Sequence, residues 1–297
     1  MGYVLLLLAT LAWSFVGVLV KSVSSMADSG WITFSRFFFG VVFLGIYLFI
    51  KDRQLKVRFN LKWIWYGAAG KSANYIFENI AITIGYAYGN ILVQPVQTVA
   101  LLAASALMYK ERVSAKGWIA AVLCIAGVLV IGWNGNPLNE LLANGGFTTF
   151  LFTLAGIGAA IHVLSQRQLV GSMDSGNMNL SVFFVSSFLV LGPIPFGEHS
   201  ATEPMNAWGW TALVLLGMIT GLSFLWFAEA IKRVSFVAVA LVGNSSVLFS
   251  ILWSYLFFHE PITGYVIAGT LIFFAGFLVL NWPMTGRSTP AERKAEA

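Results

Sequence analysis

Long apolar runs alternate with short polar gaps along this chain, and the length of the runs is informative. The hydrocarbon core of a bilayer, about 30 Å thick, requires about 20 apolar residues from each helix that crosses it. Glycine, proline, asparagine and charged residues mark the gaps between runs of that length. The pattern predicts an all-α integral membrane protein whose ten transmembrane helices cover residues 3–23, 31–50, 63–86, 89–109, 117–134, 147–169, 178–197, 207–231, 236–258 and 263–283.

The composition agrees with this class. Of the 297 residues, 58% are hydrophobic and only 10% are charged, whereas about a quarter of an ordinary soluble domain is charged. The sequence contains no phosphate-binding loop and no nucleophile elbow, so neither ATP-driven transport nor a catalytic residue has support. Cys124 stands alone and the three histidines are scattered. We therefore expect no metal site and no cofactor.

The basic residues are distributed unevenly between the two sets of gaps. If the N-terminus lies inside, the inner gaps and the tail hold most of the 17 Lys and Arg residues, whereas the outer gaps carry acidic residues. Positively charged loops face the cytoplasm, so both the N- and C-termini are predicted to be cytoplasmic. The net charge of +5 does not indicate a nucleic-acid partner, because the basic residues form no patch interleaved with exposed aromatic residues.

The second half of the chain repeats the first. Five helices per half is an odd number, so the two halves must lie inverted in the membrane, as in alternating-access transporters with a polar midplane. The predicted domains are the first five-helix repeat (1–136), the second (147–284) and a cytoplasmic tail (285–297). A shift of 149 residues places Val93, Ser105, Leu107 and Glu111 on Val242, Ser254, Leu256 and Glu260.

Polar residues concentrate between residues 71 and 98, inside otherwise apolar runs. Hydrocarbon tolerates such groups only where they face protein or water. Lys71 and Glu78 are about two turns, roughly 10 Å, apart along the helix, too far for an easy direct pair. The face either lines a cavity or joins neighbouring helices. Four residues recur at helical spacing on this face: Lys71, Tyr75, Glu78 and Ile82.

The residue types on this face suit a zwitterionic substrate. Asn74, Tyr75 and Asn79 offer amide and hydroxyl groups that bind both carboxylate and ammonium. Glu78 is a candidate for binding an amino group or a coupling proton, because burial shifts carboxyl titration toward neutral pH. His162, in the sixth span, is either a cavity wall and proton site or a structural histidine.

The fourth span carries a second polar group of residues. Gln94 and Gln97 are spaced for one face, and Pro95 removes a helical hydrogen bond beside them. This proline either exposes a carbonyl to substrate and permits gating or merely bends the helix. In the second half, Asn244 is the counterpart polar residue, and the adjacent Gly243 permits close backbone approach.

Aromatic and charged residues complete the set of candidates. Trp13 and Phe224 are candidate aromatic walls for an apolar side chain, although aromatic residues are frequent here and also serve in packing. Glu111 and Glu260 are expected to organise the tight turns between paired helices. Arg36, near the outer end of its span, is interpreted as structural.

Five features of the sequence match the pattern of a known family: LAWSFVGVLVKSV at 11–23, Arg36-Phe37, Pro95, MYKER around Glu111 and FFHEP around Glu260. Through them the chain resembles the drug/metabolite transporter superfamily, EamA type, and within it the YddG-like aromatic amino acid exporters. Asn244 departs from the pattern, which often has a second proline there. The resemblance implies a ten-helix, five-plus-five fold and secondary export of aromatic and other neutral amino acids.

These observations favour an inner-membrane secondary transporter that exports aromatic or neutral amino acids, or similar small metabolites, by alternating access. The expected partners are the small-molecule substrate and the lipid bilayer, and ten spans suffice for a monomer. One alternative keeps the fold and exports cationic drugs or other metabolites, with Glu78 supplying the charge. A remote alternative is a membrane-embedded enzyme or sensor, which lacks a recognisable catalytic set.

Overall fold

The computed structural model describes residues 2–110, 114–135, 146–191, 201–231, 233–234 and 236–281. Within these ranges all regular secondary structure is helical. The helices are α1 (Gly2–Ser14), α2 (Val16–Val23), α3 (Ser29–Asp52), α4 (Lys62–Ile84), the 3-10 helix η1 (Ala87–Leu92), α5 (Val93–Leu107), α6 (Ala115–Trp133), α8 (Gly146–Leu169), α9 (Ser175–Leu189), α10 (Ala207–Ile231), α11 (Phe236–Phe258) and α12 (Gly264–Asn281).

Helices long and apolar enough to cross a membrane confirm the membrane class. The described ranges contain six such stretches, and two shorter apolar helices accompany them near the C-terminus. The polar residues of α4, such as Lys71 and Glu78, lower its apolar character. Ten crossings and the orientation of the termini stay predictions. The six stretches are Gly2–Val23, Ser29–Asp52, Ala87–Leu107, Ala115–Trp133, Gly146–Leu169 and Ala207–Phe227.

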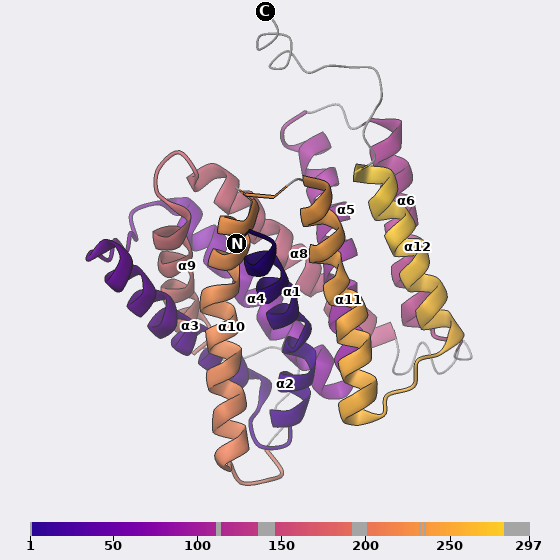
Figure 1. Ribbon diagram of the computed structural model, residues 1–297, viewed down its shortest axis with the longest axis horizontal. Coiled ribbons are helices and arrows are strands. Elements are labelled where there is room, and N and C mark those ends of the chain that lie inside the picture. The colour runs from indigo at the N-terminus through magenta and orange to yellow at the C-terminus, as the bar shows by residue number, and fades with distance from the viewer. Residues whose placement is uncertain are drawn as a thin grey trace, which may run out of the picture.

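The helices form a bundle in which sequence-distant segments lie side by side (Figure 1). At one end of the bundle α6 packs against α12, and at the other end α3 packs against both α9 and α10. Between these groups α4 packs against α8, and α1 packs against α10 and α11. Each half of the chain therefore contributes to every part of the bundle, and α4 lies at its centre.

Close backbone approach joins α6 to α12. A Cβ placed on Gly127 would lie 2.7 Å from the carbonyl oxygen of Gly269, and one on Gly276 would lie 3.0 Å from that of Ala120. Small residues permit such contacts between apolar helices, where van der Waals packing drives association. Because higher numbers on α6 oppose lower numbers on α12, the two helices run antiparallel.

The first predicted span is divided between α1 and α2 at Phe15. Trp253 of α11 donates from its indole Nε1 to the Ser14 hydroxyl at 2.9 Å, and its ring stacks on Phe15 at a centroid distance of 4.8 Å. The hydroxyl of Ser250 donates to the Ser14 carbonyl at 3.3 Å. The interruption is therefore contacted and satisfied by α11, as a local helix break requires.

The ammonium of Lys21 satisfies backbone carbonyls where α4 ends. Lys21 Nζ donates to the carbonyls of Ile82 at 3.2 Å, Thr83 at 3.3 Å and Gly85 at 2.5 Å. A cation at a helix C-terminus also complements the helix dipole. The connection between α4 and η1 is thereby fixed to the end of α2.

Glu260 has a wider role than the tight turn expected from the sequence. Both of its carboxylate oxygens accept from the backbone N–H of Ala87, at 2.9 and 2.8 Å, and one also accepts from the Ser254 hydroxyl. Its neighbour His259 has a positive φ of 52°, which ends α11 and directs Glu260 inward. Glu260 therefore connects the turn after α11 to the start of η1 in the other half of the chain.

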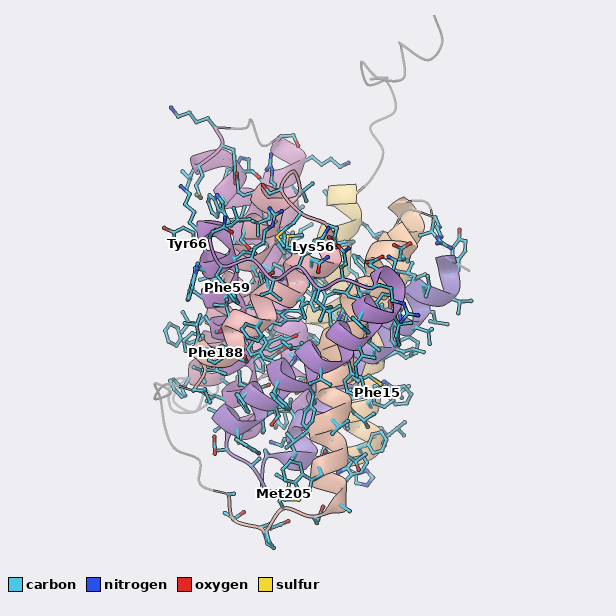
Figure 2. The ribbon with its side chains drawn as sticks, turned by 90° about the vertical axis from the view of Figure 1, so that its left-hand side faces the viewer. Phe15, Lys56, Phe59, Tyr66, Phe188 and Met205 are labelled. Carbon is cyan, nitrogen blue, oxygen red and sulfur yellow. The ribbon has the colours of Figure 1, made fainter. Side chains whose placement is uncertain are left out.

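Large apolar side chains cover the outside of the bundle (Figure 2). Phe59, Tyr66 and Phe188 are all exposed, and they lie on the side of the molecule that Figure 2 presents. In a soluble protein an apolar surface of this extent would promote aggregation, whereas lipid accommodates it. The exterior is therefore suited to a bilayer.

Candidate functional site

The polar face expected on α4 is buried and contacts α3 through an ion pair. Arg36 Nη1 donates to Glu78 Oε2 at 3.1 Å and to Asn79 Oδ1 at 2.7 Å. The exposed fractions of the Arg36 and Glu78 side chains are 3% and 11%, so solvent barely reaches the pair. Asn79 donates in turn to Thr33 Oγ1 at 2.8 Å. Two of the expected site residues, Glu78 and Asn79, are therefore engaged with α3.

Tyr75 lies beside two cationic side chains. The guanidinium carbon of Arg36 is 3.5 Å from the centroid of the Tyr75 ring, and Lys71 Nζ is 4.3 Å from it. The negative face of an aromatic ring attracts cations at such distances. The Tyr75 hydroxyl lies 3.4 Å from Thr220 Oγ1 of α10, and its ring stacks on Phe37 at 5.0 Å. Tyr75 thereby connects α4 to α3 and α10.

Lys71 is buried without an acidic partner in the described part of the chain. Its side-chain ammonium donates to Asn74 Oδ1 at 3.0 Å and lies 4.9 Å from the centroid of the Phe224 ring. The residue is 6% exposed, and neither ion pair found among the described residues includes it. As expected, Lys71 and Glu78 do not pair directly. Lys71 is thus the cation of the polar face that has only neutral contacts.

His162 lies beside α4 because α4 and α8 approach closely. A Cβ on Gly70 would lie 2.8 Å from the carbonyl oxygen of Gly158 and 2.9 Å from the backbone nitrogen of His162. His162 is 2% exposed. Neither of its ring nitrogens makes a hydrogen bond of normal geometry within the described residues, although the backbone of Gly67 lies near the ring. The imidazole therefore retains at least one hydrogen-bonding position.

Aromatic rings from several helices surround Lys71 and His162. The Phe224 ring of α10 lies 5.6 Å from Trp13 of α1, 6.0 Å from Phe183 of α9 and 6.4 Å from the His162 ring. Phe183 also lies 6.0 Å from Phe37 of α3. The polar face and the aromatic rings thus form one group, here called the central cluster: Trp13, Arg36, Phe37, Lys71, Asn74, Tyr75, Glu78, Asn79, His162, Phe183 and Phe224.

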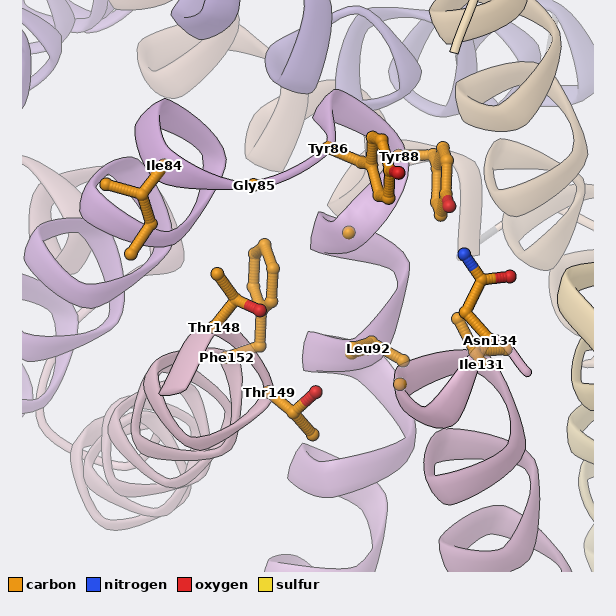
Figure 3. A pocket seen from close by; sticks show the side chains of 12 residues that line it. Ile84, Gly85, Tyr86, Tyr88, Leu92, Ile131, Asn134, Thr148, Thr149 and Phe152 are labelled. Atoms are coloured by element: carbon orange, nitrogen blue, oxygen red, sulfur yellow. The ribbon is translucent and has the colours of Figure 1, made fainter. Parts of the chain in front are cut away.

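A pocket of about 340 Å³ lies apart from the central cluster (Figure 3). It is formed by the end of α4, η1 and the facing ends of α6 and α8. The stacked rings of Tyr86 and Tyr88, 5.1 Å apart, stand on one side of it, and Phe152 with Thr148 and Thr149 lies across from them. No residue expected to bind substrate lines this pocket.

Comparison with known proteins identifies the family. The EamA-like transporter family matches residues 1–133 and 146–282, which together cover nearly all of the chain and both expected repeats. This chain belongs to the EamA-like transporter family. Its members are transporters rather than enzymes, so the EamA-like transporter described here moves a small-molecule substrate across a lipid bilayer.

Curated relatives of this EamA-like transporter support its location. The uncharacterized inner membrane transporter YhbE of Escherichia coli K12 is 21% identical over 263 residues, covering 85% of this chain and 80% of the relative. The YhbE proteins of Escherichia coli O157:H7 and Shigella flexneri match equally well. With the apolar helices, these matches make the chain a multi-pass protein of the inner membrane.

A solved structure supports the fold of the EamA-like transporter. The crystal structure of another protein superimposes on this chain with a TM-score of 0.63 at 17% sequence identity. The superposition covers 94% of this chain and 96% of the other. At this identity the likeness speaks to the fold alone.

The remaining expected site residues of the EamA-like transporter lie outside the central cluster or outside the described residues. Gln94 is exposed and Gln97 is half-buried, and no hydrogen bond within the described part joins either side chain to the cluster. Pro95 is buried in the first turn of α5, where the first N–H groups of an α-helix have no partner within that helix. Gly243 and Asn244 belong to α11, but the Asn244 side chain lies outside what the structure describes, as does Glu111 as a whole.

The sequence interpretation did not name three residues of the cluster as site candidates: Arg36, Phe37 and Phe183. Arg36, interpreted from the sequence as structural, pairs directly with Glu78 and so joins α3 to α4, while Phe37 and Phe183 contribute aromatic rings. A signal for Arg36 was present, because a buried arginine in an apolar span requires an acidic partner and Glu78 is the acidic residue of the next span. Phe183 carried no such signal, since phenylalanine is frequent throughout the chain.

Proposed function

We propose that this protein is a secondary transporter that exports aromatic and other neutral amino acids across the inner membrane by alternating access. The observation that carries the proposal is the central cluster, in which a polar face on α4 meets aromatic rings from α1, α9 and α10. An aromatic amino acid has the same division into a charged end and a ring. Sites for such ligands combine apolar walls with a few placed polar groups.

Individual contacts support the assignment of roles. Asn74 and Lys71 stand at the polar end, where donors and an acceptor are available for an amino acid backbone. Phe224 and Trp13 stand beside them with rings arranged edge to face, an arrangement that a substrate ring could extend. Both rings are only partly buried, so a ligand would have surface to cover.

Two inverted halves are part of the proposal, and the contacts of α6 with α12 support them. Gly127 and Gly276 are 149 residues apart, and so are Ala120 and Gly269. Gly127 opposes Gly269, while Gly276 opposes Ala120, so each helix makes the contact that its mate makes in return. A two-fold axis in the membrane plane produces this reciprocity and the antiparallel packing.

Backbone conformation and helix pairing agree with the same relation. Lys110 and His259, again 149 residues apart, both have a φ of 52°. The pairing of α4 with α8 recurs as that of α10 with α1, and the pairing of α5 with α8 recurs as that of α11 with α1. Ten crossings with both termini in the cytoplasm follow if every helix of each half spans the membrane. Rocking of these halves would expose the central cluster to one side at a time.

Proton coupling is proposed through Glu78 or His162. Glu78 is paired with Arg36, whereas the ring nitrogens of His162 have no partner among the described residues, so His162 is the better placed of the two. Glu78→Gln and His162→Gln transporters should be compared in liposomes with and without a pH gradient. If neither variant reduces the dependence of transport on the gradient, neither residue carries the coupling proton.

Export of cationic drugs, the alternative with the same fold, would require a carboxylate available to the ligand. Glu78 is the only acidic residue of the central cluster, and Arg36 already occupies it. We therefore do not favour cationic cargo. Inhibition of amino acid transport by lipophilic cations would restore this alternative.

Counterflow in proteoliposomes tests the proposal. Purified protein is reconstituted with unlabelled amino acid inside, and the uptake of labelled phenylalanine, tryptophan, leucine or lysine from outside is measured. We expect accelerated uptake of the aromatic and neutral amino acids and little acceleration of lysine. Absence of counterflow for every member of the panel would refute amino acid transport.

A further inference from the structure

Lys71 carries a more specific inference, which rests on the proposed function of the central cluster. We propose that the Lys71 ammonium binds an anionic group of the substrate, and that aromatic carboxylates without an amino group are substrates of the same site. The class therefore extends from aromatic amino acids to arylalkanoates such as 3-phenylpropionate.

The hydrogen bonding of Lys71 is incomplete. An ammonium has three N–H donors, and Lys71 uses one of them for Asn74 Oδ1 at 3.0 Å. Its other close neighbours are the faces of the Tyr75 and Phe224 rings, at 4.3 and 4.9 Å. Ring faces attract the charge but accept no strong hydrogen bond. The Tyr75 hydroxyl also lies within hydrogen-bonding reach of the ammonium, so at least one of the three donors is available to a ligand.

The charges of the central cluster do not cancel. Arg36 and Lys71 are cationic, Glu78 is the single acidic residue, and the 3.1 Å contact assigns Glu78 to Arg36. One buried positive charge is left over. A buried charge without a partner is costly, and a carboxylate that binds beside Lys71 would supply the partner. By the same count, the cluster offers no carboxylate to a substrate ammonium.

A second donor lies close to the same position. His162 interacts electrostatically with Lys71, and both side chains lie against Phe224, with the imidazole 6.4 Å and the ammonium 4.9 Å from its centroid. The His162 ring nitrogens have no partner within the described residues, although the side chain is almost fully buried. An N–H of this imidazole can donate to the second oxygen of a bound carboxylate.

The rings beside these donors set the rest of the substrate. Phe224 contacts Lys71, Trp13 and Phe183, so a carboxylate at Lys71 places the attached group among aromatic faces. A planar ring joined to the carboxylate by a short alkyl chain fits this arrangement, because the Phe224 centroid lies 4.9 Å from the ammonium. We therefore expect an arylalkanoate to bind at least as tightly as the corresponding aromatic amino acid, and the corresponding amine to bind far more weakly than either.

Binding of three matched probes tests the inference. Isothermal titration of the purified transporter in detergent would compare 3-phenylpropionate, phenylalanine and phenethylamine, which share the ring and differ in charge. We expect 3-phenylpropionate to bind at least as tightly as phenylalanine, and phenethylamine to bind at least about tenfold more weakly, as loss of one charge-assisted hydrogen bond predicts. Equal binding of the amine would overturn the inference without any variant.

Variants locate the effect. Lys71→Gln should weaken 3-phenylpropionate at least about tenfold and Lys71→Arg should restore most of that loss, while Lys62→Gln, an exposed lysine on the same helix, should change nothing. Unchanged binding in folded Lys71→Gln would refute the role of Lys71. If Lys71→Gln does not fold, two other measurements test the role of Lys71. They are the affinities of the wild-type protein for the three probes of different charge, and the affinity of Lys71→Arg for 3-phenylpropionate.

The inference and the proposed function fail separately. If phenylalanine shows counterflow but 3-phenylpropionate binds no more tightly than phenethylamine, the transporter proposal stays intact and the role of Lys71 is refuted. If the protein exchanges no amino acid but binds 3-phenylpropionate in a way that depends on Lys71, amino acid transport is refuted and the anion site stands.

Discussion

The guanidinium of Arg36 on α3 donates to Glu78 Oε2 on α4 at 3.1 Å, and their side chains are 3% and 11% exposed. Removal of one partner leaves the other buried and unpaired, which costs about 3–5 kcal/mol in comparable pairs. We expect Arg36→Met and Glu78→Met each to lower the melting temperature of the detergent-purified protein strongly.

The double variant is the control for this ion pair. Arg36→Met combined with Glu78→Met leaves no unpaired charge, and a buried pair exchanged for apolar groups is often neutral. We expect the double variant to be more stable than either single variant. Additive losses in the double variant would show that the two residues act independently.

The crossing of α4 and α8 depends on Gly70. A Cβ at this position would lie 2.8 Å from the Gly158 carbonyl oxygen, and these backbone atoms cannot rotate away. Gly70→Ala should destabilise the protein by about 1–3 kcal/mol, as overpacking does in cores. Gly171, which is exposed and has no atom within 4 Å of an added Cβ, provides the control. Equal melting temperatures for Gly70→Ala and Gly171→Ala would refute the close approach of α4 to α8 at Gly70.

Glu260 holds the start of η1 through the N–H of Ala87. Replacement by Gln removes the charge and weakens these bonds, and hydrogen bonds to charged groups contribute about 1.5–3 kcal/mol. Glu260→Gln should therefore lower the melting temperature, whereas Glu203→Gln, at an exposed site, should not. Equal melting temperatures for the two variants would argue that Glu260 merely occupies the turn.

Asp174 predicts a pH dependence at the start of α9. Partial burial by itself raises the pKa of the Asp174 carboxyl, but hydrogen bonds from the side chain and backbone of Asn177 outweigh it and hold the pKa below its ordinary value. A carboxyl with a lowered folded pKa stabilises the protein above its unfolded pKa of about 3.9, and this contribution is lost as the pH falls.

The comparison with Asp174→Asn isolates that charge, because asparagine is an equally good helix cap. Melting curves from pH 7 downward should show the wild type more stable at pH 7 and the difference shrinking below about pH 4. A difference that stays constant across this range would contradict the assignment.

Much of the fold was predictable because hydrocarbon imposes a length and an apolar composition on each helix. The α1–α2 interruption at Phe15 was not, because it depends on contacts with Trp253, more than two hundred residues away in the chain. The helical spacing on α4 correctly grouped Tyr75 and Glu78, since that relation is local.

The composition of the site was predictable only within single helices. The partnership of Arg36 with Glu78 depends on how α3 and α4 lie against one another, which periodicity does not specify. Gln94 shows the converse, because a polar residue in an apolar run suggested a cavity, yet its side chain is exposed. A polar residue in an apolar run shows where a helix departs from a purely lipid-facing role. Packing then determines whether that residue contacts another helix, lines a cavity or is exposed.

Counterflow of labelled phenylalanine by the wild type, Phe224→Ala and Phe188→Ala transporters would show whether the central cluster binds the transported amino acid. Phe224 lies in the central cluster, whereas Phe188 is on the surface, 60% exposed (Figure 2). We expect rapid exchange by the wild type and by Phe188→Ala, and a fall of about 30-fold in Phe224→Ala, as loss of about 2 kcal/mol at an aromatic anchor implies. No exchange by the wild type, or equal exchange by both variants, would refute amino acid transport through the central cluster.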